Sequence, residues 1–158
     1  MAGLLQVEGL RRRFGSVVAL DGLTFDVPAG EVVGFLGPNG AGKTTTMRAI
    51  FGLTDLDGGT VRWNGASVSQ ADRRAFGYMP EERGLYPGML VGEQVEYLGR
   101  LHGLSRAESA RETAGWLERL DIATRRGDKV ETLSHGNQQR VQLAAALVHA
   151  PELLVLDE

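Results

Sequence analysis

The sequence has no cysteine among its 158 residues, so it can form neither disulfide bonds nor thiolate metal sites. It also lacks the roughly 18 consecutive apolar residues that a membrane-spanning helix needs. Its first residues, MAGLLQVEGL, lack the basic start and apolar core of a signal peptide. The net charge is only −3, which excludes a strong field that would attract nucleic acid or anionic lipid. We therefore expect no membrane span and no nucleic-acid partner, and a reducing compartment is compatible with the composition.

Glycine, in contrast, is frequent: the chain has 22 glycines, which indicates tight turns or close approaches of the backbone to a ligand. Hydrophobic residues make up 42% of the sequence, and its length is sufficient for one domain with a core. The basic run at 11–13 is typical of a solvated face. The three histidines show no metal-ligand spacing, and His102 and His149 are expected at the surface or at helix ends.

Short strands are expected at both ends of the chain. The run EVVGFLG at 31–37 is continuously apolar and predicts a central strand buried on both faces. Other apolar segments lie between glycine and proline breakers and read as strands. They cover residues 4–10, 23–27, 60–65, 74–80 and 152–157.

Helices are expected between and after these strands. Apolar residues recur at helical spacing over 91–120, with a break near 103–105. Two further helices are expected at 43–51 and at 137–149, the second ended by Pro151. The order predicts an α/β core that carries a helical subdomain. The expected division is a core at 1–88, a helical subdomain at 89–149 and an acidic strand at 150–158.

The stretch GPNGAGKTT matches the phosphate-loop pattern G-x-x-x-x-G-K-[ST] between a predicted strand and a predicted helix. Its glycines let successive N–H groups point at phosphate oxygens, and the helix start adds a positive dipole end. The lysine would contact the β- and γ-phosphates and the first threonine a Mg²⁺ ion. The alternative, a glycine-rich turn that binds nothing, does not explain this context. The expected nucleotide-binding residues are Gly37, Pro38, Asn39, Gly40, Ala41, Gly42, Lys43, Thr44 and Thr45.

Two acids, Asp157 and Glu158, follow the apolar run LLVL. In a phosphate-loop NTPase, an acid at the tip of a neighbouring strand holds Mg²⁺. We assign that role to Asp157, and Glu158 is the candidate general base that polarises the attacking water. The acids alone indicate only a strand end, so this prediction depends on the phosphate loop.

The stretch LSHGNQQR, residues 133–140, resembles the signature L-S-G-G-Q of ABC ATPases, with His135 and Asn137 as departures. Together with GYMPEERGLYP at 77–87, it is most similar to ATP-binding subunits of ABC-2 exporters for sodium or drugs. The resemblance implies an ABC ATPase fold with N-terminal antiparallel strands and a helical signature subdomain. It also implies ATP and Mg²⁺ as ligands.

The signature implies a second anion site formed by Ser134 and Gly136, which would close on the nucleotide of a second subunit. From the residues alone, Ser134 is equally an ordinary N-cap with Gln138 nearby. The resemblance also assigns Phe14 to adenine stacking, for which a core or edge phenylalanine is the alternative. Glu81 stands where the family usually has a glutamine that senses Mg²⁺ and the water.

The neighbouring Glu82 is an alternative to Glu81 in that role. Tyr86 and Pro87 lie in the segment that would face a membrane subunit, or form a simple surface turn. The resemblance thus implies a dimer of ATP-binding subunits attached to a permease, at the cytoplasmic face of the cell membrane.

The family's later elements are expected to be missing. These are the loop after the acidic strand, a histidine that contacts the γ-phosphate and the last core strands. We therefore expect a fold that is incomplete at its C-terminus, and an isolated chain that is aggregation-prone or partly unfolded and has no measurable ATPase activity. Two alternatives remain for the function: a non-transport ABC ATPase acting on ribosomes or DNA, and an inactive nucleotide-binding fragment.

Overall fold

Two compact units make up the chain, and a computed structural model describes its residues 3–81 and 84–157. The described part of the first unit is residues 3–73 together with Asp157. The described part of the second unit is residues 74–81 and 84–156. The short helix α2 (Gln70–Arg74) spans the boundary between them. Each unit has its own sheet and its own buried side chains.

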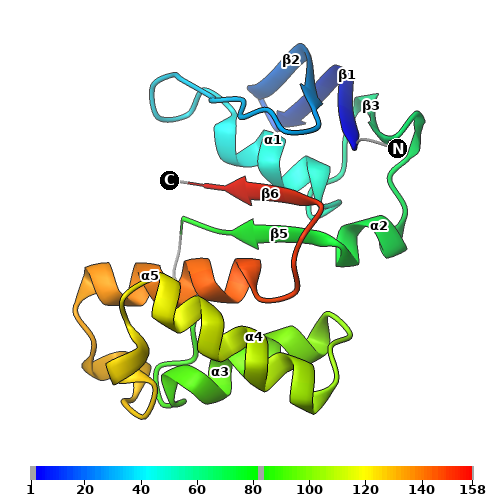
Figure 1. The fold of residues 1–158 in the computed structure, drawn as a ribbon. Helices are drawn as coiled ribbons and strands as arrows, with labels where there is room; N and C mark the ends of the chain where they lie inside the picture. Colours follow the sequence, from blue (N-terminus) through cyan, green and yellow to red (C-terminus); the bar gives the residue numbers. More distant parts are fainter. Residues whose placement is uncertain (1–2, 82–83, 158) are drawn as a thin grey trace. The chain divides into compact units, whose positions relative to one another are not determined.

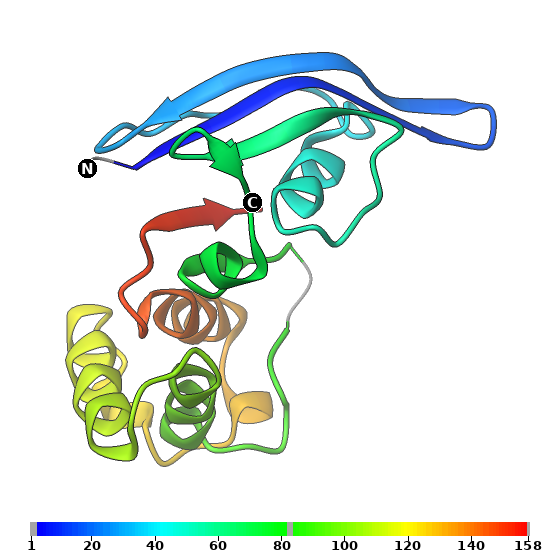
Figure 2. The same ribbon diagram turned by 90° about the vertical axis from the view of Figure 1, so that its right-hand side faces the viewer.

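The first unit is built on a four-stranded antiparallel sheet in the order β2-β1-β3-β4. Its strands are β1 (Leu4–Phe14), β2 (Val17–Pro28), β3 (Gly58–Trp63) and β4 (Ala66–Ser67), and the long pair β1 and β2 is seen at the top of Figure 2. Leu5, Val7 and Leu10 of β1 are fully buried. The predicted N-terminal antiparallel strands are therefore confirmed.

A two-residue turn, Asn64–Gly65, joins β3 to β4, and Trp63 pairs with Ala66 across it. Both turn residues have positive φ, 52° and 82°, which is what tight hairpins between twisted strands require. Asn64 also exchanges hydrogen bonds with the backbone of Leu4. The turn therefore ties the hairpin to the start of β1.

Helix α1 (Lys43–Ile50) follows the glycine-rich turn directly and was correctly predicted. It buries Thr46, Ala49 and Ile50, which are spaced at i, i+3 and i+4 and so share one face. Burial of this face fixes the position of the helix, and with it the position of its first turn.

The predicted central strand at 31–37 was wrong. No described residue pairs with this run as a strand, and Val32 and Leu36 are each 99% exposed. Phe35 alone packs closely, with its ring edge-on to Phe25 at 4.8 Å between centroids. An apolar run becomes a strand only when neighbouring strands accept and donate its backbone hydrogen bonds, and sequence pattern cannot supply those partners.

The second unit combines a two-stranded parallel sheet with helices. Strand β5 (Phe76–Met79) pairs with β6 (Leu153–Leu156), with Phe76 opposite Leu153. In Figure 1 the two strands lie side by side and α5 (His135–Leu147) runs along β5. Both strands were predicted, but β6 is only partly buried, and Leu156 is 47% exposed.

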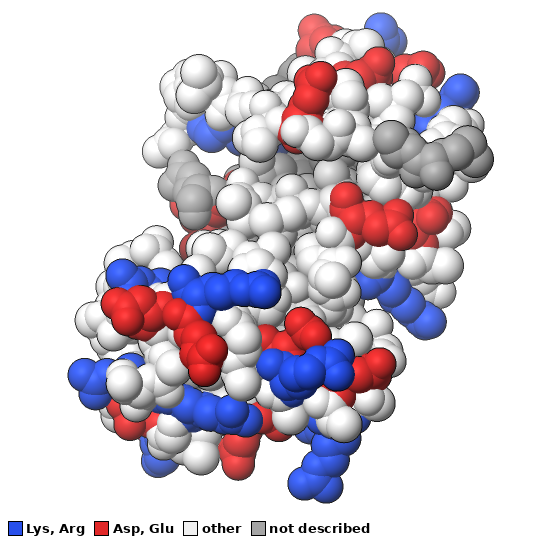
Figure 3. Space-filling model, viewed as in Figure 1, with Lys and Arg blue, Asp and Glu red and all other residues white. Residues whose placement is uncertain are grey.

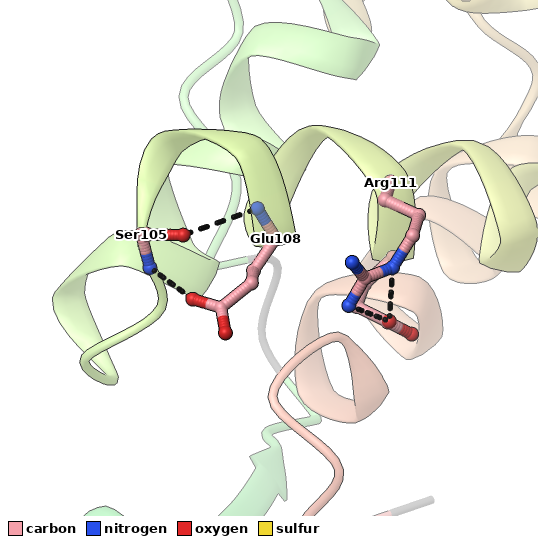
Figure 4. Close-up of polar contacts among 4 residues, drawn as sticks. Ser105, Glu108 and Arg111 are labelled. Carbon is pink, nitrogen blue, oxygen red and sulfur yellow. Dashed lines mark hydrogen bonds and ion pairs between the residues drawn. The ribbon is translucent and has the colours of Figure 1, made fainter.

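Three helices and two short 3-10 turns enclose the core of this unit. The other helices are α3 (Val91–Leu101) and α4 (Arg106–Arg119), with 3-10 turns η1 (Ala123–Arg125) and η2 (Val130–Thr132) between α4 and α5. The predicted break near 103–105 is where Ser105 caps α4: its hydroxyl accepts from Glu108 N, and the Glu108 carboxylate accepts from Ser105 N (Figure 4). The core side chains come from all three helices, from η2 and from residues that flank these elements: Val91, Val95, Leu117, Ile122, Val130, Leu133, Val141, Ala144, Ala145 and Val148.

Charges of both signs lie next to each other over the helical unit, in the lower part of Figure 3. Several form ion pairs, including Arg126 with Glu96 at 2.6 Å and Arg125 with Asp128 at 3.1 Å. No helix within the described residues is long and apolar enough to cross a membrane.

Candidate functional site

Glycine geometry shapes the predicted phosphate loop in the first unit. Gly40 and Gly42 have φ of 83° and 86°, a region that side chains disfavour. A Cβ on Gly42 would lie 2.3 Å from the carbonyl oxygen of Ala19, so the loop packs on β2 only because this residue has none. Ala41 N donates to Pro38 O at 3.2 Å and closes the turn. The curled backbone expected from the sequence is therefore present.

Lys43 folds back over this loop. Its Nζ donates to Gly37 O at 2.8 Å and to Pro38 O at 3.0 Å. These two bonds hold the ammonium group above the loop backbone instead of letting it extend into solvent. The positive charge is thus held against the carbonyl oxygens of the predicted phosphate loop.

The start of α1 adds to this positive environment. No acidic residue lies in its first turn, and no side chain caps its N-terminus at Gly42. The N–H groups of the first turn, which includes Thr44 and Thr45, have no partner within the helix and carry its positive dipole end. This is the arrangement that binds phosphate groups at a helix start.

Asp157, the predicted Mg²⁺ ligand, lies beside the helix start. Thr44 Oγ1 donates to Asp157 Oδ1 at 3.1 Å, and Asp157 is only 2% exposed. Neighbouring ligands of an octahedral Mg²⁺ are about 2.9 Å apart, so the spacing of these two oxygens fits that ion. Within residues 3–81 and 84–157, no three His, Asp or Glu side chains form a metal site by themselves. Mg²⁺ usually completes its coordination with phosphate oxygens and water.

In the second unit, Ser134 caps α5. Its hydroxyl accepts from Asn137 N at 3.4 Å, so the N-cap alternative describes its local role. Gly136 is exposed in the first turn, and no atom of the described residues would lie within 4 Å of a Cβ there. Ser134 is also exposed. The cap and the predicted second anion site are compatible, because both use the same helix start.

The remaining predicted residues have different surroundings. Phe14 ends β1 with 49% of its surface exposed, and the Arg12 guanidinium lies 4.7 Å from its ring centroid. Phe14 is therefore not a core residue. Glu81 is exposed in the second unit, just after β5. Glu82 and Glu158 lie outside the described residues.

Sequence reasoning missed a stacked pair of histidines. His102 and His149 lie with ring centroids 3.7 Å apart, and they contact the carbonyl oxygens of Arg74 and Phe76, respectively. Burial, and next to it the charge of His102, lower the pKa of His149 to about 4, although the hydrogen bond to Phe76 O acts to raise it. No spacing rule brings two histidines 47 positions apart together, so only the fold shows this pair.

A buried glutamine, Gln142, was also missed. It is 6% exposed on α5, and its Nε2 donates to Pro80 O at 2.7 Å. The available signal was a polar residue between apolar helix positions, next to Val141. A buried amide must find hydrogen-bond partners, so such a residue predicts a specific contact but not its partner.

A sequence model of the ABC transporter family matches residues 20–158. The chain belongs to the ABC transporter family. This confirms the family resemblance and the ABC ATPase fold. It also gives the phosphate loop, the Thr44–Asp157 contact and the signature stretch a common context.

Individual ABC transporter proteins agree. The chain is 46% identical over 155 residues to the uncharacterized ABC transporter ATP-binding protein YhaQ of Bacillus subtilis, covering 98% of this chain and 52% of YhaQ. It is 39% identical over 158 residues to Nod factor export ATP-binding protein I of Ralstonia nicotianae, covering 98% and 49%. A solved ATP-binding subunit of an ABC transporter superposes with a TM-score of 0.87 at 32% identity, covering 98% and 66%. The chain spans about half the length of these two curated relatives.

Proposed function

We propose that this chain belongs to the ATP-binding subunit of an ABC exporter, which couples binding and hydrolysis of MgATP to transport through a membrane subunit. The observation that carries the proposal is the 3.1 Å contact between Thr44 and the buried Asp157, next to a phosphate loop closed by Lys43. Two oxygens and one ammonium around a helix start are the groups that a triphosphate with Mg²⁺ needs. The word export in the name of the Ralstonia nicotianae relative supports the direction of transport.

Each residue then has a role in the hydrolysis of ATP. The loop from Gly37 to Thr45 binds the phosphates, and Lys43 neutralises charge that develops on the γ-phosphate. Thr44 and Asp157 would hold Mg²⁺, whose chemistry there would be to withdraw charge from the phosphate oxygens. Glu158 accepts the proton of the attacking water.

Other predicted residues act around this centre. Phe14 stacks on adenine. Glu81, or Glu82 in its place, contacts Mg²⁺ and the water. Ser134 and Gly136 of one subunit complete the site of the other, so the active unit is a dimer. The proposal also divides the chain into a core, a helical subdomain and an acidic strand.

The test uses the full protein that carries this chain. Wild type should hydrolyse ATP only with Mg²⁺, and it should co-purify with a polytopic membrane protein at the cytoplasmic side of the membrane. Glu158→Gln should bind ATP but lose turnover and accumulate ATP-bound dimers, because an amide cannot accept the proton. Turnover at the wild-type rate in this variant would exclude Glu158 as the base. Co-purification with ribosomes or DNA instead of a membrane protein would favour a non-transport ATPase.

A further inference from the structure

One face of α5 contacts two backbone segments of the second unit, one that leads into Ser134 and one that leads into Glu81. The proposed function assigns a role to each of these two residues. Gln138, Gln142 and Ala146 are four residues apart and therefore line up along one side of the helix. All three are buried, with exposures of 7%, 6% and 5%. The signature lies at the start of α5, and strand β5 runs along the helix (Figure 1).

At the signature end, Gln138 fixes the backbone that leads into Ser134. Its Nε2 donates to Val130 O at 3.0 Å and to Leu133 O at 3.2 Å. Both carbonyls lie in or just after the 3-10 turn η2, immediately before the N-cap. The position of Ser134 is thus set by the helix that it caps.

In the middle of this face, Gln142 fixes the backbone that leads into Glu81. Its Nε2 donates to Pro80 O at 2.7 Å. Proline has no N–H of its own, and its carbonyl belongs to the peptide unit whose nitrogen is that of Glu81. The bond therefore determines where the chain leaves β5 and where Glu81 begins.

At the other end, α5 and β5 are in backbone contact. A Cβ on Gly77 would lie 2.4 Å from Ala146 O and 3.0 Å from side-chain atoms of Leu154 and Pro151. So close an approach leaves no freedom for β5 to slide along the helix. The Gln142 bond is therefore held in register by packing one turn away.

From these contacts we infer that Gln142 is a positioning residue, which ties Glu81 to the signature helix so that the two move as one body. The inference rests on the proposed function, because it matters for hydrolysis only if Glu81 acts at the Mg²⁺ and the water. In this role Gln142 acts through its bond to the Pro80 backbone and takes no part in the chemistry. When α5 shifts on closing against a second subunit, Glu81 shifts with it.

The test is Gln142→Met, which keeps the length of the side chain but loses the donor and leaves Pro80 O without this bond. In the full protein with ATP and Mg²⁺, kcat should fall about tenfold, and the Mg²⁺ concentration for half-maximal rate should rise. The dissociation constant for ATP should stay within about twofold, because the phosphate loop is unchanged. Gln142→Glu should be at least as impaired, because a carboxylate accepts and does not donate.

Gln70→Met, an exposed glutamine on α2, is the matched control and should behave as wild type. Hydrogen exchange gives a readout independent of activity: the peptide spanning 79–81 should exchange faster in Gln142→Met and not in Gln70→Met. Unchanged exchange with unchanged kcat and Mg²⁺ dependence would overturn the inference. If the wild type shows no Mg²⁺-dependent turnover, the proposed function is refuted. The exchange experiment still decides, in that case, whether Gln142 positions residue 81.

Discussion

At the scale of single residues, Lys43 is the clearest target for a test. Its ammonium is bound to Gly37 O and Pro38 O, so it already lies over the loop. In the full protein, we predict that Lys43→Ala weakens ATP binding roughly 100-fold, because a charge-assisted contact to phosphate is lost. Titration with a fluorescent ATP analogue measures this.

Arg48→Ala, in the last turn of the same helix, is the control. It removes a positive charge from an exposed position and should leave the affinity nearly unchanged. Equal affinities for wild type and Lys43→Ala would exclude the loop as the phosphate site.

A second prediction at this scale concerns pH and His149. The folded protein holds this histidine at a pKa of about 4, whereas an exposed histidine has about 6.5. Between pH 4 and pH 6.5, the unfolded state binds a proton on this histidine that the folded state does not bind. The contribution of the neutral ring to the free energy of unfolding is therefore complete above pH 6.5 and is lost as the pH falls toward 4. We expect the melting temperature of wild type to fall more between pH 7 and pH 5 than that of His149→Gln. Parallel pH profiles for the two proteins would contradict the burial of an uncharged ring.

At the scale of elements, the contact between β5 and α5 depends on Gly77. Gly77→Ala places a Cβ 2.4 Å from Ala146 O, so the strand or the helix must move. We predict a loss of about 1–3 kcal/mol in the free energy of unfolding, the usual cost of overpacking. Urea unfolding followed by circular dichroism measures it.

Gly115→Ala is the matched substitution with the opposite expected sign. Gly115 lies inside α4, and no atom within 4 Å would contact a Cβ there. Alanine in a helix interior is favoured by about 1 kcal/mol over glycine, so this variant should gain stability. A gain in both variants would show that β5 and α5 are not in tight contact.

Features that depend on neighbours in sequence were predicted, whereas features that depend on distant partners were not. The break at Ser105, the start of α1 after Gly42 and the helical spacing of 91–120 depend on neighbours in sequence, and all were predicted. The strand at 31–37 was not formed, because an apolar run does not state which strands will pair with it.

In the candidate site, too, a continuous stretch could be predicted, and contacts between distant residues could not. The phosphate loop is one continuous stretch, so its residues could be named from spacing alone. Gln142 could not, because its partner Pro80 is 62 positions away and is a backbone carbonyl that carries no sequence signal. The stacked histidines were missed for the same reason.

At the scale of the whole molecule, the proposed dimer can be tested through Ser134. Ser134→Arg in the full protein should leave ATP binding by the single subunit intact, since the phosphate loop itself is unchanged. The bulk of the arginine should prevent formation of the ATP-bound dimer. Size-exclusion chromatography of the double variant Glu158→Gln and Ser134→Arg would detect this loss. Loss of ATP binding by the monomer would place Ser134 in its own subunit's site.

Ser105→Arg is the control for losing a helix cap. Ser105 caps α4 as Ser134 caps α5, and each substitution should cost about 1 kcal/mol in stability. Only the change at Ser134 should abolish the dimer. A dimer lost in both variants would point to general destabilisation instead.

The pairing of β5 with β6 has a consequence for how the chain is made. Phe76 pairs with Leu153, so roughly 75 residues must be added after β5 before its partner strand exists. At 5–20 residues per second, a ribosome needs roughly 4–15 s for this stretch. Helix formation takes about a microsecond, so it is not the slow step, and until β6 has been made the edge of β5 that faces it has no partner strand. Of the elements that pack on β5, β6 is therefore the last to be synthesised, after the α5 helix that contacts Gly77.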